Sequence, residues 1–337
     1  MPPLKDGVNK MFDTSFDEKE TEILKRLDDF IPEKIFDAHC HLSNASHAPD
    51  GMLKELSDRG ALEWRDDMKA LYGKRDVRAL LLAFPTAPMK NNPELVKEVN
   101  EWMQRQVELL PECFGTIYTV PGDTPEKLES LIVNDRIKGF KPYHLTSGGE
   151  GETSQHDICQ YLPEAAWQVA EEKHMTITLH MVKDKALSDP VNMAYIKEHA
   201  KKYPHAVLIL AHCARGFASW TAIEAVREIK DIPNVYYDLA AICDPATMFE
   251  IIRQAGTHKV MWGTDYPIDR IAGRPINMGD YFTWIYPYQL PDGLNIPVKK
   301  TVIESLFSFY QASLMLDMTK KDIEQVFNNT AAELFGF

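Results

Sequence analysis

An α/β fold is predicted for this chain, namely a (β/α)8 TIM barrel with an N-terminal helical lead-in and extra C-terminal helices packed on it. Short apolar runs alternate with helix-like segments between about residues 34 and 265. Eight such runs occur, which is the number of strands that this barrel needs. A doubly wound open sheet is the competing fold, but it more often has a glycine-rich turn after its first strand. None follows "FDAHCHL" (36–42).

The expected strands are short, mostly apolar runs with many β-branched and aromatic residues. This composition is typical of strands that are buried on both faces. Their ranges are 34–40, 77–84, 113–120, 137–143, 175–182, 206–213, 234–242 and 259–265.

Helices are predicted where apolar residues recur three and four positions apart. An amphipathic segment at 17–31 leads into the first strand, and the tail from about 275 to 337 has a helical pattern. We therefore divide the chain into an N-terminal helical extension (1–33) and a barrel domain (34–337). Clear helical segments between the strands are 91–110, 162–174, 189–203 and 217–230.

The loop "SGGEGETSQ" (147–155) is expected to be the most mobile segment. Its glycines and polar residues offer nothing to bury.

The composition disfavours a nucleic-acid or anionic-membrane partner. The 337 residues include 37 basic and 50 acidic residues, which gives a formal charge of −13. Five widely spaced cysteines without a C-x-x-C pair suit a reducing compartment. The N-terminal segment lacks the apolar run of a signal peptide, and no later segment approaches the roughly 18 apolar residues of a membrane span. We therefore expect a cytoplasmic protein.

His39 and His41 stand one residue apart in the first expected strand. Side chains two positions apart in a strand point to the same face, so both imidazoles should face together and could share a metal ion. A single H-x-H pair has little specificity in a chain with 11 histidines. Alone, it also fits a polar strand end or two separately hydrogen-bonded histidines.

Three further residues with metal-binding side chains close later strands: His180 the fifth, His212 the sixth and Asp265 the eighth. In a TIM barrel the carboxyl ends of the strands meet at one mouth, which holds the active site. Several imidazoles and one carboxylate suit zinc or a similar divalent ion. Each residue alone could be a strand-end side chain bonded to a backbone carbonyl, but together they predict a metal site. Other histidines are expected on loops or helix surfaces, namely His47, His144, His156, His174, His199 and His205.

These motifs resemble those of the amidohydrolase superfamily, in the branch that contains aminocarboxymuconate semialdehyde decarboxylase. "FDAHCH" stands where that family has its strand-one H-x-H. "LH" (179–180) and "AH" (211–212) match its strand-five and strand-six histidines, and "GTDYP" (263–267) matches its strand-eight aspartate motif. The final "FNNTAAELFGF" resembles the family's closing helix, so the resemblance extends over residues 34–337.

The resemblance implies a role for each of these residues. His39, His41, His180 and Asp265 are implied as metal ligands. His212 and Asp265 are the implied catalytic residues: His212 polarises substrate or water, and Asp265 accepts a proton while it touches the metal. We expect one divalent ion, most simply Zn²⁺, with Mn²⁺ as the alternative, because such an ion lowers the pKa of bound water.

Lys141 closes the fourth strand, where other amidohydrolases place a carboxylated lysine that bridges two metal ions. If Lys141 were carboxylated, His180 and His212 could both bind a second ion. We prefer an unmodified ammonium group that holds a substrate carboxylate or a neighbouring acid.

Several cations follow the strands, which favours an anionic substrate. Arg215 is the foremost candidate because it stands three residues beyond His212, although most Lys and Arg side chains are solvated surface. The candidate substrate-binding residues are Arg215, Lys141, Lys183 and Arg270, with Arg274 close by. Candidate apolar walls, which could equally be core residues, are Tyr143, Tyr266, Trp262 and Trp220.

Two enzymatic functions fit these residues. One is a metal-dependent hydrolase that uses a metal-activated water on a small, anionic amide, ester or lactone. The other is a non-oxidative decarboxylase of an aromatic or unsaturated carboxylic acid with the same ligands. A non-catalytic barrel should have lost a ligand, and none is missing. We favour hydrolysis, with a small-molecule carboxylate as the partner, and the sequence leaves a homodimer open.

Overall fold

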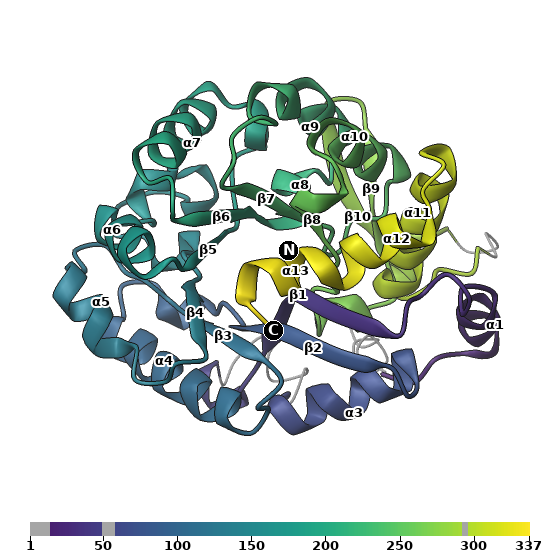
Figure 1. Ribbon diagram of the computed structural model, residues 1–337, viewed down its shortest axis with the longest axis horizontal. Helices are drawn as coiled ribbons and strands as arrows, with labels where there is room; N and C mark the ends of the chain where they lie inside the picture. Colours follow the sequence, from purple (N-terminus) through teal and green to yellow (C-terminus); the bar gives the residue numbers. More distant parts are fainter. Residues whose placement is uncertain (1–13, 49–57, 292–295) are drawn as a thin grey trace.

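The computed structural model describes residues 14–48, 58–291 and 296–337. Its main sheet has eight parallel strands in the order β1 to β8, surrounded by helices (Figure 1). The sheet closes where β1 meets the segment after β8. The amide of Ala38 donates to the carbonyl of Trp262 at 2.9 Å, and the amide of Asp265 donates to that of His39 at 2.8 Å. The predicted (β/α)8 barrel is therefore confirmed.

The first two strands are long and the later ones are short. In β1 (Lys34–Leu42) every residue after Lys34 is buried, as expected for a strand covered on both faces. From β3 onward, each regular strand ends three or four residues before its predicted end, and the remaining residues form the loops of the mouth. The strands are β2 (Asp76–Ala83), β3 (Phe114–Ile117), β4 (Ile137–Phe140), β5 (Thr176–Leu179), β6 (Val207–Leu210), β7 (Val235–Asp238) and β8 (Val260–Met261).

Several barrel helices begin at a polar capping residue that is followed by proline. Asn92, Asp189 and Asp244 each accept a backbone N–H from the first turn of the helix that follows. These caps fix where the connections after β2, β5 and β7 become helical. The helices between the strands are α3 (Ala61–Tyr72), α4 (Pro93–Glu108), α5 (Pro125–Leu131), α6 (Glu164–Lys173), α7 (Pro190–Lys202), α8 (Ala211–Arg215), α9 (Ser219–Ala225) and α10 (Pro245–Ala255).

The N-terminal extension is attached to the C-terminal part of the chain. Its helix α1 (Glu18–Arg26) starts at a capping box and is shorter than the predicted 17–31 segment. The carboxylate of Glu20 lies 3.1 Å from the ammonium of Lys300, and the Phe30 ring packs edge-on against Phe309. The division of the chain after residue 33 stays a prediction. No helix among the described residues is both long and apolar enough to cross a membrane.

The tail contains a β-hairpin that the sequence analysis predicted wrongly as helix. Strands β9 (Arg274–Met278) and β10 (Tyr281–Ile285) pair antiparallel, and the turn between them uses Gly279 at φ +64°. Phe282 and Trp284, two positions apart, share one face of β10, and this period of two was the missed signal. The helices predicted beyond it are present as α11 (Thr301–Met315), α12 (Lys320–Glu324), a π-helical turn (Gln325–Asn329) and α13 (Thr330–Phe335).

Helix α13 crosses the amino-terminal end of the barrel (Figure 1). The ring of Phe335 stacks 5.2 Å from that of Phe36 at the start of β1 and 5.4 Å from that of Phe114 at the start of β3. This contact closes the end of the barrel opposite the mouth.

The loop 147–155 is fastened at its ends. Ser147 and Thr153 are buried, and each hydroxyl lies within 2.8 Å of a histidine Nδ1, that of His156 and His144 respectively. The expectation that this loop has nothing to bury is therefore wrong.

Candidate metal centre

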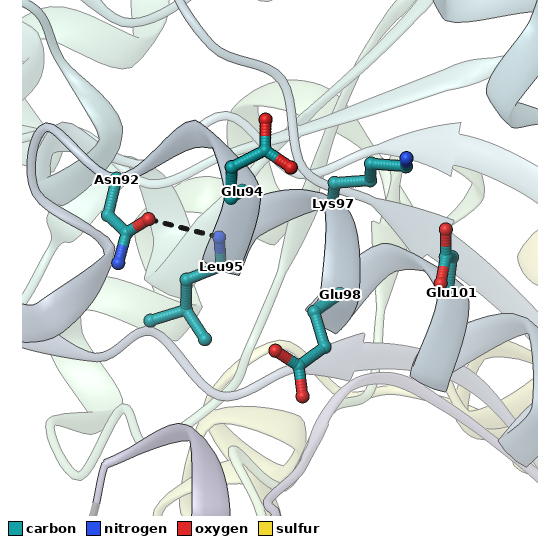
Figure 2. A pocket seen from close by; sticks show the side chains of 6 residues that line it. All are labelled: Asn92, Glu94, Leu95, Lys97, Glu98 and Glu101. Atoms are coloured by element: carbon teal, nitrogen blue, oxygen red, sulfur yellow. Dashed lines mark hydrogen bonds between the residues drawn. The ribbon is translucent and has the colours of Figure 1, made fainter.

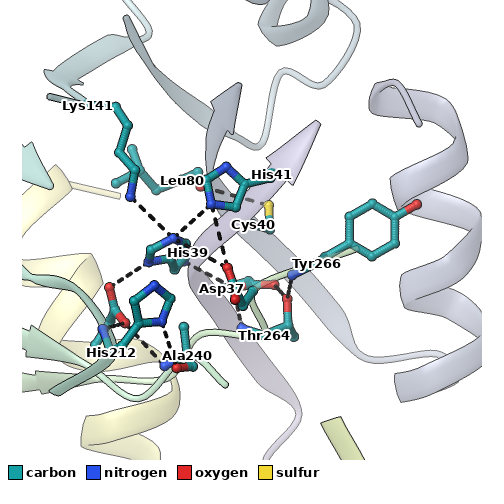
Figure 3. Close-up of polar contacts among 12 residues, drawn as sticks. Asp37, His39, Cys40, His41, Leu80, Lys141, His212, Ala240, Thr264 and Tyr266 are labelled. Carbon is teal, nitrogen blue, oxygen red and sulfur yellow. Dashed lines mark hydrogen bonds and ion pairs between the residues drawn. The ribbon is translucent and has the colours of Figure 1, made fainter. Parts of the chain in front are cut away.

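The paired histidines of β1 are both buried and converge. Their Nε2 atoms lie 3.0 Å apart (Figure 3). The β1–β2 register shifts between Asp37 and Cys40, so β1 holds one extra residue in the stretch that contains His39. Gly263 faces this point, and a Cβ there would lie 3.1 Å from the Cβ of His39. The close approach of the two segments therefore favours the glycine of "GTDYP".

Hydrogen bonds orient three of the imidazoles. Nδ1 lies 2.9 Å from a fixed oxygen in each: Asp238 Oδ2 for His39, the Ala83 carbonyl for His41 and the Ala240 carbonyl for His212. These oxygens only accept hydrogen bonds, so each Nδ1 carries the proton. Each Nε2 is then unprotonated, which is the arrangement of histidines that bind metals.

Asp265 adds a carboxylate to this cluster. Its Oδ1 lies 3.6 Å from His39 Nε2 and 3.5 Å from His41 Nε2. His212 belongs to the same cluster, since donor atoms of His39, His212 and Asp265 all lie within 4.8 Å of one another. Ligands around a tetrahedral zinc with bonds of about 2.0–2.1 Å are about 3.3–3.4 Å apart, so the donor set fits a divalent ion.

His180 also reaches the mouth, directly after β5. Its ring lies 5.1 Å from that of His212, and its side chain is partly exposed. The structure thus brings the five residues proposed for metal binding and catalysis to one place. The ligand role of His180 and the non-ligand role of His212 stay predictions.

Lys141 is a cation that lies within hydrogen-bond distance of one of these histidines. Its side chain is buried directly after β4, and its Nζ lies 3.3 Å from His39 Nε2 (Figure 3). Burial lowers its pKa to about 8, although the carboxylates of Asp238 and Asp265 act in the opposite direction. Whether Lys141 is carboxylated stays a prediction.

Burial dominates the electrostatics of the centre. Loss of solvent lowers the pKa of His212 to about 4 and holds the pKa of His39 and His41 well below the usual value. It also raises the pKa of Asp265 well above the usual value. The imidazoles are therefore neutral at neutral pH, and a bound cation would favour the ionised form of Asp265.

Asp238 at the end of β7 is a residue that the sequence analysis missed. It is fully buried, and besides the bond to His39 its Oδ1 accepts the amides of His212 at 2.8 Å and Ala240 at 3.1 Å. One carboxylate thus orients His39 and holds the backbone that carries His212. The available signal was an acidic residue in the middle of the otherwise mostly apolar predicted strand 234–242.

Residues 212–215 form a single left-handed turn. His212, Cys213, Ala214 and Arg215 have φ of 55°, 50°, 60° and 60°. Left-handed backbone costs a non-glycine residue roughly 1–2 kcal/mol. Such strain persists where surrounding structure imposes it, and here the turn begins at His212 and ends at Arg215.

The predicted substrate-binding cations have different surroundings. Lys183 Nζ pairs with Asp157 and lies 3.3 Å from Asp189. Arg270 is 1% exposed and donates to the carbonyl of Asp67 at 3.3 Å. Neither has a contact with the histidine cluster among the described residues, and their roles stay predictions. Arg274 pairs with Glu304 at 2.8 Å.

The four aromatic residues predicted to line the site lie in different surroundings. The ring of Tyr143 lies 4.9 Å from that of His180, beside the mouth. Trp262 and Tyr266 are fully buried, and their polar atoms bond to Tyr72 and Asp67 at 2.9 Å and 2.8 Å, so both are core residues. Trp220 is half-buried on α9.

Other side chains near the mouth were missed or placed wrongly. Phe217 has its ring 5.1 Å from that of His212, and the ring of His144 lies 6.2 Å from that of His180. Of the histidines expected on the surface, His47 and His156 are buried.

A separate hollow lies against α4 (Figure 2). Asn92 caps the helix there by accepting the amide of Leu95 at 3.2 Å. The hollow holds none of the predicted site residues; it is lined by Asn92, Glu94, Leu95, Lys97, Glu98 and Glu101.

Comparison with known proteins assigns the family. The model of the amidohydrolase family matches residues 36–337. The chain belongs to this family. The prediction of an enzyme from the amidohydrolase superfamily is thereby confirmed.

Individual relatives are distant. An L-fucono-1,5-lactonase from Burkholderia ambifaria is 23% identical over 181 residues, which cover 48% of this chain and 56% of that protein. The chain thus matches about half the length of this curated relative. An amidohydrolase from Burkholderia multivorans with bound zinc has a TM-score of 0.58 at 12% identity, covering 90% of this chain and 99% of its own. A dihydroxybenzoic acid decarboxylase from Polaromonas sp. JS666 with bound manganese has a TM-score of 0.53 at 15% identity, with 90% and 97% covered.

Proposed function

We propose that this protein is a metal-dependent hydrolase that cleaves a small, anionic lactone, ester or amide. The observation that carries the proposal is the cluster of His39, His41, His212 and Asp265, whose three imidazoles each hold Nδ1 on a fixed oxygen and leave Nε2 unprotonated. The proposed ligands of a single ion are His39, His41, His180 and Asp265. Zinc is preferred to manganese because most of these donors are imidazole nitrogens.

When bound, a divalent ion would supply Lewis acidity and lower the pKa of water toward neutrality. Asp265 would accept a proton from the attacking water, because its carboxylate faces the cluster at 3.5 Å from His41 Nε2. His212 would polarise the substrate carbonyl or the water. The carbonyl of Ala240 fixes its ring, so little reorganisation accompanies the reaction.

Two cations support an anionic substrate. Lys141 lies beside His39, and Arg215 follows His212 after a single turn. Both could hold a carboxylate away from the reacting bond. The similarity to a protein named as a lactonase favours a lactone as the first substrate to test.

Decarboxylation is the second candidate, favoured by the aromatic surroundings of the mouth. The Phe217 ring lies against His212, and Tyr143 lies against His180. Such walls suit an aromatic or unsaturated acid. In that reaction the same residues would orient the acid, and a proton would be delivered to the carbon that loses carbon dioxide.

One experiment separates the candidates. Metal-replete protein is incubated with a panel of lactones, acyl amides and aromatic carboxylates while acid release and carbon dioxide are measured. We expect acid release without carbon dioxide. Carbon dioxide alone would reverse the order of the candidates, and neither product would refute both.

A pair of variants serves as the control for that experiment. His39→Gln should abolish the reaction because it replaces an imidazole nitrogen of the cluster with a weakly coordinating amide. His205→Gln, which changes an exposed histidine outside the centre, should leave it unchanged.

Cytoplasmic location and a homodimer stay predictions. None of the five cysteines is in a disulfide, which supports a reducing compartment. Light scattering of the purified protein tests the dimer.

A further inference from the structure

Helix α1 of the N-terminal extension buries an acidic side chain instead of an apolar one. Glu20 is the only buried residue of this helix and is 2% exposed. An acidic residue is almost never buried this far unless it is paired. The extension lies before residue 36, where the match to the amidohydrolase family begins, and the proposed function does not use it. The partners of Glu20 therefore indicate what the extension does.

The carboxylate of Glu20 holds the chain just before α11. Its Oε1 accepts the backbone amide of Lys300 at 2.8 Å, and its Oε2 lies 3.1 Å from the ammonium of the same residue. Oε2 also accepts the amide of Asp17 at 3.0 Å, and the carboxylate of Asp17 pairs with the ammonium of Lys299 at 3.0 Å. Residues 299–300 are thus attached to the extension through both backbone and side chains.

The chain at the start of α11 pairs in turn with the segment that follows Asp265. The amide of Gly273 donates to the carbonyl of Lys299 at 3.0 Å. The amide of Thr301 donates to the carbonyl of Ile271 at 2.9 Å, and its hydroxyl donates to the carbonyl of Gly273 at 2.9 Å. The extension is therefore connected by hydrogen bonds, through the start of α11, to the loop that carries Asp265.

A buried guanidinium forms a second link between the extension and this loop. Arg270 is 1% exposed, and its Nε lies 3.5 Å from Asp269 Oδ1 without a hydrogen bond. Its guanidinium carbon lies 5.3 Å from the ring centre of Phe16 in the extension. The ring centre of Tyr266, the residue after Asp265, lies 5.7 Å from the same carbon. Cation–ring attraction is strongest where water is excluded, so Phe16 helps to hold Arg270 against Tyr266.

The backbone of Asp265 must be held from both sides. Its φ of 65° is left-handed, and such a conformation persists where the surrounding structure imposes it. Before it, the carboxylate of Asp37 accepts the amide of Thr264 at 2.9 Å. After it, the amide of Ile268 closes a turn on the carbonyl of Asp265 at 2.8 Å. The contacts of the extension fix the chain beyond that turn.

We propose that the N-terminal extension positions Asp265, with Glu20 and Phe16 as the positioning residues. Glu20 acts through Lys300, and Phe16 acts through Arg270. Together they fix the loop after β8 from outside the barrel, so that the carboxylate of Asp265 stays on the histidine cluster. This inference rests on the proposed function, because the roles of Asp265 as a metal ligand and proton acceptor belong to that function.

Hydrogen–deuterium exchange of the full-length, zinc-loaded protein tests whether the extension holds the loop. Glu20→Gln keeps the shape of the side chain, but its NH₂ group must face either the amide or the ammonium of Lys300, and neither can accept a hydrogen bond. Amide exchange in segment 265–273 should rise about 2- to 30-fold, the range for residues that modulate a distant element. Phe16→Leu, which removes the ring from Arg270, should raise exchange in the same segment.

Cobalt and zinc report whether Asp265 itself is displaced. In the cobalt-substituted protein, Glu20→Gln should change the visible spectrum of the bound ion, because the spectrum depends on the positions of its ligands. Zinc affinity, measured by competition with a chromophoric chelator, should weaken about 2- to 30-fold. A role of Glu20 in stability alone would leave the spectrum of the folded protein unchanged.

Two matched controls remove other contacts of the same extension. Asp28→Asn removes an ion pair with Arg75 at 2.8 Å, and Phe307→Leu removes the ring that lies 5.1 Å from the guanidinium carbon of Arg26. Neither contact involves segment 265–273. Both controls should exchange in this segment as wild type does and keep its cobalt spectrum, and circular dichroism checks that every variant is folded.

Three results would overturn the proposal. They are wild-type exchange of segment 265–273 in Glu20→Gln or Phe16→Leu, an equal rise in a control, and an unchanged cobalt spectrum in Glu20→Gln. If the variants that give these results bind zinc as wild type does, only the positioning role fails. Failure of wild type to bind zinc or cobalt would instead refute the proposed function, and the exchange of segment 265–273 would still show whether the extension holds the loop.

Discussion

Replacing Asp238 with asparagine should weaken metal binding although Asp238 is not a proposed ligand. In the structure Oδ1 accepts two backbone amides, from His212 and Ala240, and Oδ2 accepts Nδ1–H of His39. An asparagine that keeps its oxygen on the two amides turns its NH₂ toward His39. The imidazole must then move its proton to Nε2, where it blocks the lone pair that faces the centre.

The size of this effect follows from the bonds involved. In the opposite orientation, the asparagine oxygen accepts the Nδ1–H of His39, so the imidazole keeps its proton on Nδ1. The asparagine NH₂ then points at the backbone N–H groups of His212 and Ala240, and each buried N–H left without an acceptor costs about 1–3 kcal/mol. Both orientations therefore carry a penalty. Loss of a hydrogen-bond partner of a metal ligand typically costs 10- to 100-fold in metal affinity, or about 1.4–2.7 kcal/mol. We expect a weakening of zinc binding in that range.

The assay is competition for zinc between the protein and a chromophoric chelator of known affinity. Cobalt substitution adds a second readout, because the electronic spectrum of the ion reports a displaced ligand. Asp244→Asn is the matched control: Asp244 caps α10 by accepting the amide of Ala246, and asparagine caps equally well. A zinc affinity of Asp238→Asn within twofold of wild type, with an unchanged cobalt spectrum, would refute the reasoning.

Four further outcomes are expected. His39→Ala should lose metal and activity together, whereas His212→Ala should keep its metal, read by emission spectroscopy on dialysed protein, and lose about 10²–10⁴-fold in turnover. If His212→Ala also loses its ion, His212 is a ligand. Arg215→Ala should raise KM more than it lowers kcat in steady-state kinetics, and the reverse would place Arg215 in the chemistry. Elemental analysis and intact mass should give one ion per chain and an unmodified Lys141; two ions and a carboxylated lysine would contradict this. Phe335→Ala should lower the free energy of unfolding in urea by about 2 kcal/mol, less than for a fully buried ring, and no change would contradict the role of α13 in closing the barrel.

The sequence was sufficient for the barrel because each strand is a short apolar run, and burial on both faces demands that composition. The sequence did not show at which residue each strand ends. In "AVLILAHC" the apolar pattern continues through Ala211, but the chain leaves the regular strand after Leu210 and enters a left-handed turn. The hydrogen bond from the His212 amide to Asp238 helps to hold that departure, and no local pattern encodes a contact 26 residues away.

For the site, too, the sequence predicted which residues come together but not the direction of every side chain. Strand-end position brought His39, His180, His212 and Asp265 to one mouth, because the barrel aligns all carboxyl ends. Strand-end position did not show which side chains after β8 face the mouth and which face the core. Tyr266, one residue beyond Asp265, turns away from the cluster to Asp67 on α3. The direction of a side chain after a two-residue strand depends on the loop geometry, not on alternation along the strand.

Part of the left-handed, non-glycine backbone lies where the proposed chemistry lies. Asp265 at φ 65° and the run from His212 to Arg215 are non-glycine residues in left-handed conformation, each costing roughly 1–2 kcal/mol. Glycine would remove this cost but would also remove the carboxylate, the imidazole and the guanidinium on which the proposed function depends. Cys213 and Ala214 carry no such group, yet they must share the conformation because a single turn separates His212 from Arg215. The turn is therefore best understood as the connection that places the proposed catalytic imidazole and the substrate-binding cation in the same mouth.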